Sequence, residues 1–207
     1  MINKIIKDDK NLTDPTEIAN VFNVYFANVG KNLASTIPVV QKSPLEYMQI
    51  NEQPWDSFFL SPISECEIED EISKLKPGKA SGPFSIPIKA LQTLKSVIVR
   101  PSEILFNLSF ETGIVPSSFK MANVIPIYKK GSQTNVSNYR PISLLSIFNE
   151  LLEKRMCKRL LKFLEKKNIF YNKQFGFRNK HSTQHAILSI IDKIQKAIDD
   201  KTFSCGI

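Results

Sequence analysis

The pattern of apolar positions predicts a chain that is mostly helical. In residues 14–35, apolar side chains recur every three or four residues, which is the spacing of one helix face. Asp14, Pro15 and Glu17 supply a cap, a first-turn proline and a capping-box acid. The stripe needs a partner surface, and packing is a far commoner role for it than a cofactor site. Its members are Ile18, Val21, Phe22, Tyr25, Phe26, Val29 and Leu33.

Shorter helices are predicted in the middle of the chain. Ser64 and Glu67 have capping-box spacing, and the helix that they begin should end near Pro77. Helical patterns resume over residues 87–99 and 101–111. We expect Pro101 to start the second of these and Gly113 to end it.

Two longer helices are predicted near the end of the chain, from about Ser146 to Lys167 and from Ser182 onward. The buried stripe expected in the first consists of Phe148, Leu151, Leu152, Met156, Leu160, Phe163 and Leu164. Its other positions are crowded with Lys154, Arg155, Lys158, Arg159, Lys162 and Lys166. The buried face expected in the second consists of Ile187, Ile190, Ile191, Ile194 and Ile198.

Residues 123–145 predict a β-hairpin that carries positive charge. Residues 124–128 and 142–145 form short apolar runs suited to strands, although Pro126 favours a sheet edge or bulge. The loop between them opens with Lys129 and Lys130 and continues with Gly, Ser, Asn, Gln and Thr. This composition is typical of an exposed turn where backbone and side chains can meet a ligand.

These elements predict an α+β chain, mainly helical, with a small antiparallel hairpin. Residues 37–62 lose the periodicity and contain four prolines, so we interpret them as a linker. We therefore expect a helical connector and linker over residues 1–60 and a second domain over residues 61–207.

Positive charge is concentrated in one segment of the chain. The formal net charge is +8, yet Lys120 to His181 holds 14 Lys or Arg residues against three acidic ones. The remainder is therefore net acidic, and a phosphate-bearing partner is the natural inference for the basic segment. A solvated basic helix face is the alternative, and charge by itself favours that alternative.

Cysteine usage and hydropathy favour an intracellular protein, in the nucleus or the cytoplasm. The three cysteines are widely spaced and odd in number, which fits a reducing compartment better than a disulfide framework. Charges or prolines interrupt every hydrophobic stretch, so we expect no membrane partner.

Two further patterns have weak chemical signals. The loop at residues 75–87 could bring backbone N–H groups and Lys79 near phosphate, but it lacks the ending of a nucleotide-binding P-loop. His181 and His185 have the spacing of a metal pair without an obvious third ligand, so no metal site is predicted.

Three segments in this order resemble the reverse transcriptases of non-LTR retrotransposons, the LINE class and particularly its jockey-like elements. They span much of residues 61–207, and the N-terminal helix is similar to the connector between endonuclease and polymerase. The segments read SPISECEIEDEISKLKPGKASGPFSIP (61–87), PSSFKMANVIPIYKKGSQTNVSNYRPISLLSIFNELLEK (116–154) and QFGFRNKHSTQHAIL (174–188).

The resemblance implies a partial right-hand polymerase, with the fingers and the start of the palm. In this family the fingers hairpin folds over the incoming dNTP, and the positions matching its basic residues are Lys129 or Lys130 and Arg140. Arginine can bind phosphate oxygens in a bidentate manner and lysine supplies a compact charge.

The segment QFGFR is similar to one that lies near template and nucleotide. Its residues are therefore candidates for template contact together with Lys79, and Phe175 or Phe177 could stack on a base. The candidates in this segment are Gln174, Phe175, Gly176 and Arg178.

Two departures from the family pattern limit these expectations. Phe84 stands where the family commonly has an acidic residue. Nucleotidyl transfer also needs carboxylates that hold two divalent ions, Mg²⁺ in the full-length family, and Asp199 and Asp200 match neither of the family's aspartate motifs. We assign no catalytic or metal-binding residue, and expect no bound Mg²⁺ and no activity from this fragment by itself.

The partners implied are an RNA template, a DNA primer, dNTP and the missing palm and thumb of the parent polymerase. The alternative function is a basic RNA- or DNA-binding module without catalysis.

Overall fold

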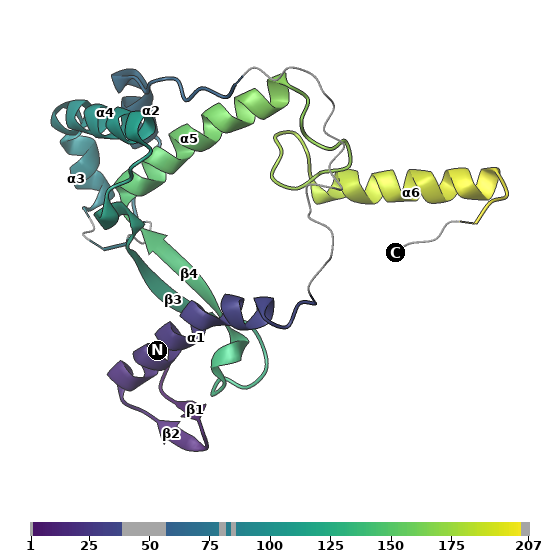
Figure 1. The fold of residues 1–207 in the computed structure, drawn as a ribbon, viewed down its shortest axis with the longest axis horizontal. Helices are drawn as coiled ribbons and strands as arrows, with labels where there is room; N and C mark the ends of the chain where they lie inside the picture. Colours follow the sequence, from purple (N-terminus) through teal and green to yellow (C-terminus); the bar gives the residue numbers. More distant parts are fainter. Residues whose placement is uncertain (1, 39–56, 79–81, 84–85, 204–207) are drawn as a thin grey trace. The chain divides into compact units, whose positions relative to one another are not determined.

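The computed structural model describes residues 2–38, 57–78, 82–83 and 86–203 (Figure 1). These residues form α-helices, short 3-10 helices and two antiparallel hairpins, so the predicted α+β character is confirmed. By its internal contacts the chain divides into two compact units, Met1–Met156 and Cys157–Ile207. The elements are β1 (Ile5–Lys7), β2 (Lys10–Leu12), α1 (Pro15–Ala34), α2 (Glu65–Ser73), α3 (Ile88–Thr93), α4 (Lys95–Thr112), η2 (Ser117–Lys120), β3 (Ala122–Tyr128), η3 (Val136–Asn138), β4 (Tyr139–Leu145), α5 (Ile147–Lys166) and α6 (Thr183–Asp199).

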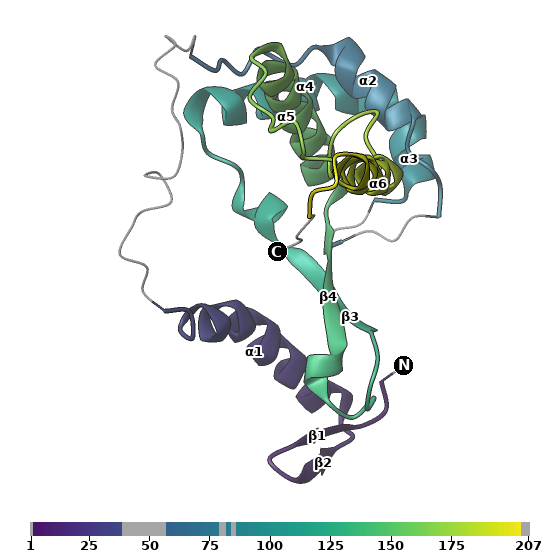
Figure 2. The ribbon, with the colours of Figure 1, turned by 90° about the vertical axis from the view of Figure 1, so that its right-hand side faces the viewer.

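Helix α1 begins as predicted and has a partner for its apolar stripe. The Asp14 carboxylate accepts a hydrogen bond from the Glu17 N–H at 2.9 Å, which caps the helix. Ile18 and Phe22 are buried and form a small core with Ile5 and Tyr139. The first half of the stripe therefore packs on β1 and on the loop end of the β3–β4 hairpin (Figure 2), whereas Leu33 near the end of the helix is 63% exposed.

A second, larger core joins α2, α3, α4, η2 and the start of α5. Phe106, Ile72 and Leu91 are fully buried within it. The predicted capping box at the start of α2 is confirmed, because Ser64 and Glu67 each accept a hydrogen bond from the other's backbone N–H. Local hydrogen bonding thus fixes where α2 starts, and apolar burial fixes how it packs.

Pro101 does not start a helix, contrary to the sequence prediction. It lies inside α4, which begins at Lys95 after a break at Leu94. A proline inside a helix costs about 3 kcal/mol. Burial of Val99 and Phe106 on either side of it holds the two parts in one helix. Gly113 ends α4 in the left-handed conformation with φ of 69°, as predicted.

The predicted hairpin is confirmed and is longer than expected. Strands β3 and β4 pair antiparallel from Ala122–Leu145 to Tyr128–Tyr139. Beyond the last pair the Lys129 N–H donates to the Asn138 carbonyl at 2.8 Å, which extends the ladder toward the loop. The second strand begins at Tyr139, so Arg140 lies within it.

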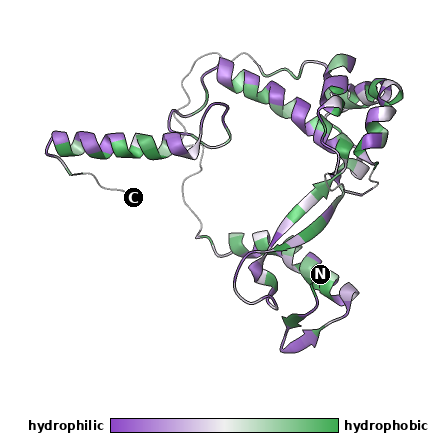
Figure 3. Ribbon diagram, turned by 180° about the vertical axis from the view of Figure 1, so that it is seen from behind, coloured by the Kyte–Doolittle hydropathy of each residue, from purple (hydrophilic) through white to green (hydrophobic). Residues whose placement is uncertain are grey.

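In the unit Cys157–Ile207, helix α6 begins at the predicted cap. The Ser182 hydroxyl accepts a hydrogen bond from the His185 N–H at 3.4 Å. The prediction of a buried isoleucine face is wrong here, because α6 has no buried residue and Ile191 and Ile194 are 43% and 44% exposed. Figure 3 shows apolar and polar stretches alternating along this helix.

A helix that crosses a bilayer needs about 20 consecutive, predominantly apolar residues. In the described parts of the chain, no helix combines the length and the apolar character needed to cross a membrane.

Candidate nucleotide-binding hairpin

The register of β3 and β4 gives the hairpin two different faces. Paired residues share a face and successive residues alternate between faces. One face includes Tyr128, Tyr139 and Pro126 and is turned toward α1. The other, which we call the open face, carries Ile125, Ile127, Arg140 and Ile142, all of them exposed.

Lys129 and Arg140 lie on the open face. Arg140 is paired with Ile127, and Lys129 follows Ile127 by two residues. Diagonal neighbours of this kind have Cα atoms about 7–8 Å apart, within reach of long side chains. Both side chains are exposed, and neither forms an ion pair with a described carboxylate. The hairpin thus presents two cations on one surface.

Lys130 lies beyond the paired strands, at the start of the turn. Gly131 follows with a φ of +89°, in the left-handed region that favours glycine. Its carbonyl accepts a hydrogen bond of 2.5 Å from the Tyr128 hydroxyl. The register therefore distinguishes the two lysines: it places Lys129 beside Arg140, and leaves Lys130 in the turn.

Hydrogen bonds between loop residues order the rest of the turn. The Asn138 side chain donates to the Ser132 carbonyl at 2.9 Å. The Asn135 side chain accepts from the Ser137 N–H at 3.0 Å and so caps η3. The polar composition of this loop, predicted as an exposed turn, thus supplies its internal structure.

Tyr139 fixes the loop end of β4. Its ring packs against Phe22 with a centroid distance of 5.0 Å, and its hydroxyl donates to the Gln133 carbonyl at 2.6 Å. Burial raises the pKa of the Tyr139 phenol above its ordinary value, and the neighbouring Tyr128 hydroxyl raises it further. The residue next to Arg140 is therefore held from both sides, by a helix and by the loop.

The other end of β4 meets the glycine-containing loop that follows α2. The Gly82 N–H donates to the Leu145 carbonyl at 3.1 Å. A Cβ atom on Gly82 would lie only 2.7 Å from the Leu145 carbonyl oxygen, so glycine permits this close backbone approach. Lys79 and Phe84, singled out in the same loop, lie outside the described residues.

The QFGFR segment folds as a loop in the unit Cys157–Ile207. Arg178 donates to the carbonyls of Tyr171 at 3.3 Å and Gln174 at 3.4 Å, and its guanidinium lies 5.0 Å from the Phe170 ring centroid. The Gln174 side-chain amide donates to the Gly176 carbonyl at 3.4 Å. Three of the predicted template-contacting residues are thus joined within one loop, where Arg178 also has a structural role.

Phe175 and Phe177, the two candidates for stacking on a base, differ in their contacts and exposure. The Phe175 ring lies beside His181, with a centroid distance of 6.1 Å. Phe177 is fully exposed and has a φ of 57°, which is rare for a bulky residue. Because such backbone strain concentrates at functional positions, Phe177 is the better candidate for stacking on a base.

Comparison with curated proteins gives one group of relatives. The chain is 29% identical over 157 residues to the RNA-directed DNA polymerase from mobile element jockey of Drosophila melanogaster, a match covering 75% of this chain and 17% of the relative. It is 30% identical over 145 residues to the probable RNA-directed DNA polymerase from transposon BS of the same species, covering 70% and 16%. The chain is a relative of the jockey-type reverse transcriptases.

The same group includes the probable RNA-directed DNA polymerase from transposon X-element of Drosophila melanogaster, 26% identical over 156 residues, with 75% of this chain and 17% of the relative covered. The resemblance stated from the three segments is thereby confirmed. The chain spans about one sixth of the length of these reverse transcriptases, 16–17%. No family model matches the chain.

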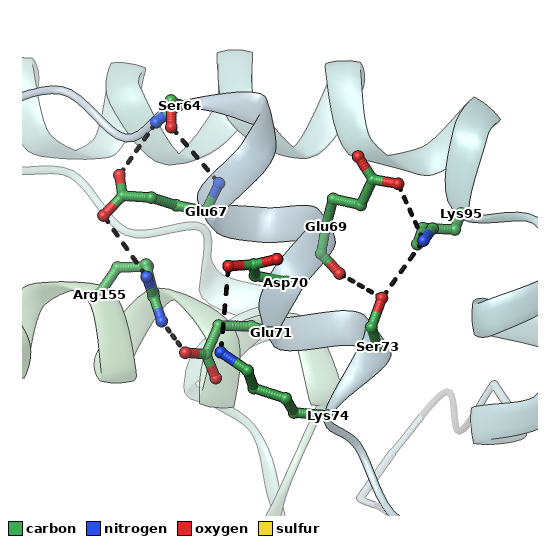
Figure 4. A network of polar contacts seen from close by, with 9 residues as sticks. All are labelled: Ser64, Glu67, Glu69, Asp70, Glu71, Ser73, Lys74, Lys95 and Arg155. Atoms are coloured by element: carbon green, nitrogen blue, oxygen red, sulfur yellow. Dashed lines mark hydrogen bonds and ion pairs between the residues drawn. The ribbon is translucent and has the colours of Figure 1, made fainter.

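The reverse transcriptase resemblance did not indicate a buried charged residue, Arg155. Arg155 was expected on the basic face of α5, but its side chain is only 4% exposed and it forms ion pairs with Glu67 and Glu71 of α2 (Figure 4). The four-residue spacing of the two glutamates, together with the position of Arg155 one turn after Leu151, could have indicated this contact.

The Mg²⁺ ions that reverse transcription would require need several convergent oxygen ligands. In residues 2–38, 57–78, 82–83 and 86–203, no three His, Cys, Asp or Glu side chains come together in a way that could hold a metal ion. The described residues therefore do not fit such a centre, and we assign no role to a metal here.

Proposed function

We propose that this chain forms the fingers and the start of the palm of an RNA-directed DNA polymerase of a non-LTR retrotransposon. The similarity to jockey-type polymerases supports this proposal, as does the order of the three matching segments. In this role the hairpin binds incoming dNTP, and the loop containing Gln174, Phe175, Gly176 and Arg178 contacts the template together with Lys79. An RNA template and a DNA primer are the other partners, and the protein acts inside the cell, in the nucleus or the cytoplasm.

The shared open face of Lys129 and Arg140 is the observation that carries the nucleotide-binding role. A triphosphate presents several anionic oxygens within a short distance, and two adjacent cations match that arrangement. Arg140 can bind two oxygens with one planar group, while Lys129 adds a point charge. Lys130 contributes only long-range attraction, because it lies in the turn.

The 207 residues by themselves are proposed not to polymerise DNA. Nucleotidyl transfer needs carboxylate-held divalent ions, and these residues contain no match to the family's aspartate motifs. The palm and thumb of the parent polymerase would supply what the chemistry requires. A primer-extension assay on the purified chain tests this, and dNTP incorporation that EDTA abolishes would contradict it.

The nucleotide-binding role is tested by measuring dTTP affinity by calorimetry. Arg140→Ala should weaken dTTP binding at least about tenfold, because a hydrogen bond to a charged group contributes roughly 1.5–3 kcal/mol. Lys129→Ala should weaken it too, whereas Lys130→Ala should have a smaller effect. Lys89→Ala, which removes an exposed lysine from α3, is the control.

Thermal melting separates binding from folding in the same variants. Arg140 is exposed, so Arg140→Ala should leave the melting temperature unchanged. A loss of folded protein would mean that Arg140 is structural, and undiminished dTTP affinity in that variant would contradict the proposed role.

A second candidate function is a basic nucleic-acid-binding module without catalysis. Its support is a row of exposed lysines on α5 at intervals of four residues, about 6 Å apart along the helix. Such a row could follow a phosphate backbone. The row consists of Lys154, Lys158, Lys162 and Lys166.

Salt dependence of RNA binding tests the second candidate. The affinity for a single-stranded RNA should fall steeply as salt rises, and replacing both Lys158 and Lys162 by Gln should reduce the slope of log affinity against log salt by about 1.4. Absence of RNA binding at low salt would argue against this function.

A further inference from the structure

Residues of the N-terminal segment hold the loop end of the β3–β4 hairpin. The Ile6 N–H donates to the Thr134 carbonyl at 2.9 Å, which ties β1 to the hairpin loop. Next to it Ile5 is fully buried, in a core with Ile18, Phe22 and Tyr139. Contacts from strand β1, from helix α1 and within the hairpin loop therefore converge on one end of the hairpin (Figures 1 and 2).

Tyr139 links this core to the cation beside it. Its ring is buried against Phe22, and the next residue in the chain, Arg140, lies on the opposite, open face. The Tyr139 hydroxyl also binds the Gln133 carbonyl at 2.6 Å, so the loop joining the strands is attached to the same side chain. The position of Tyr139 thus determines where the backbone of Arg140 lies.

A hairpin of two strands needs such external support. Two-stranded hairpins are marginally stable in water by themselves. The open face of this one leaves Ile125, Ile127 and Ile142 exposed by 41–48% and so contributes little burial. At the loop end Tyr139 is buried, in a core with Ile5 of β1 and with Ile18 and Phe22 of α1.

We propose that residues 2–38 act as a brace that positions Lys129 and Arg140 for phosphate binding, with Phe22 and Tyr139 as the positioning residues. This rests on the proposed nucleotide-binding function. Neither positioning residue touches the nucleotide: they act by holding the hairpin loop and the start of β4 in one conformation. Removing the brace lowers affinity for dTTP because the two cations must then be ordered on binding.

Two measurements on the 207-residue chain test the brace. Hydrogen–deuterium exchange reports the order of the hairpin loop, and dTTP affinity reports its effect on binding. Phe22→Ala should speed exchange of amides at residues 134–140 at least about tenfold and weaken dTTP binding about tenfold, while α4 amides near Phe106 keep their protection. Phe22→Leu should keep most of the amide protection at residues 134–140 and most of the dTTP affinity. Val24 lies on the same helix and is 55% exposed, so Val24→Ala should change neither the amide exchange nor the dTTP affinity.

Tyr139→Phe covers the case in which Phe22→Ala unfolds the chain. It keeps the ring but removes the 2.6 Å hydrogen bond to the Gln133 carbonyl, so loop exchange should rise and dTTP affinity fall with α4 protection intact. Binding of dTTP that neither variant weakens would overturn the brace. Failure of the unsubstituted chain to bind dTTP would overturn the nucleotide role itself, and the positioning role with it.

Discussion

The rings of Phe22 and Tyr139 meet edge to face, with planes inclined at 78° and centroids 5.0 Å apart. This arrangement suits two aromatic rings and contributes roughly 0.5–1.5 kcal/mol beyond the area that it buries. Phe22 belongs to the stripe of α1 and Tyr139 begins the second strand of the hairpin. The pair therefore joins two segments that are separated by more than a hundred residues of sequence.

Alkaline pH should weaken the contribution of the Tyr139 hydroxyl to stability. Its pKa in the folded chain is raised above the ordinary value of 10.0 by burial and by Tyr128. The folded state therefore keeps the proton more tightly than the unfolded state, and the stabilisation present below pH 10 is lost as pH rises through the folded pKa. Urea unfolding from pH 8 to 11 should show the stability difference between the parent chain and Tyr139→Phe decreasing above pH 10.

The Tyr139→Phe chain has no titrating group at this position, so it controls for the general loss of stability at high pH. A difference between the two chains that stays constant across the range would contradict this prediction.

Gly82→Ala should destabilise the chain. The added Cβ would lie 2.6 Å from the Leu145 carbonyl carbon, and backbone atoms cannot move aside as a flexible side chain can. Overpacking of this kind typically costs about 1–3 kcal/mol. The matched control is Gly30→Ala inside α1, where an added Cβ meets nothing within 4 Å. Because alanine favours helix over glycine, the control should gain about 0.5–1 kcal/mol.

Urea denaturation measures both glycine variants, and the prediction is that their effects have opposite signs. Equal stabilisation of the two would show that the loop at Gly82 adjusts without cost.

Arg155→Ala should be among the most destabilising changes on α5. Its side chain is 4% exposed and its loss leaves the carboxylates of Glu67 and Glu71 without their buried cation. Breaking a buried pair in this way costs about 3–5 kcal/mol. The lower end is expected here, because the Glu67 side chain is 32% exposed and water screens part of its charge.

Lys154→Ala, at the adjacent exposed position, is the control and should change stability by less than about 0.5 kcal/mol. Chemical denaturation compares the two variants. Similar small effects in both would show that the ion pairs across α2 and α5 contribute little.

The features that were predictable from the sequence depend on neighbouring residues. The caps at Asp14, Ser64 and Ser182 and the stop at Gly113 are set within a few residues, and each is confirmed. The hairpin was also predictable, because two apolar runs on either side of a polar loop are a local signal. Its two faces follow from the register, which places Arg140 opposite Ile127.

The features that the sequence did not reveal depend on contacts between distant segments. Pro101 stays inside a helix because residues on both sides of it are buried, and local propensity carries no information about that burial. Arg155 was assigned to the basic face because its neighbours are basic, yet its partners lie more than eighty residues earlier. Gly82 lies in a loop whose sequence gives no sign of a close contact, and only the position of β4 makes glycine necessary there.

Substitutions on α6 should have little effect on the stability of this chain. Isoleucine and serine have similar helix propensities, so Ile191→Ser mainly removes apolar surface. Ile191 is 43% exposed, and this change should therefore alter the unfolding free energy by less than about 0.5 kcal/mol. Ile72→Ala, at a fully buried position of the larger core, is the comparison and should cost about 2–5 kcal/mol. Urea unfolding followed by circular dichroism measures both, and equal losses would mean that the isoleucine face of α6 packs against the rest of the chain in solution.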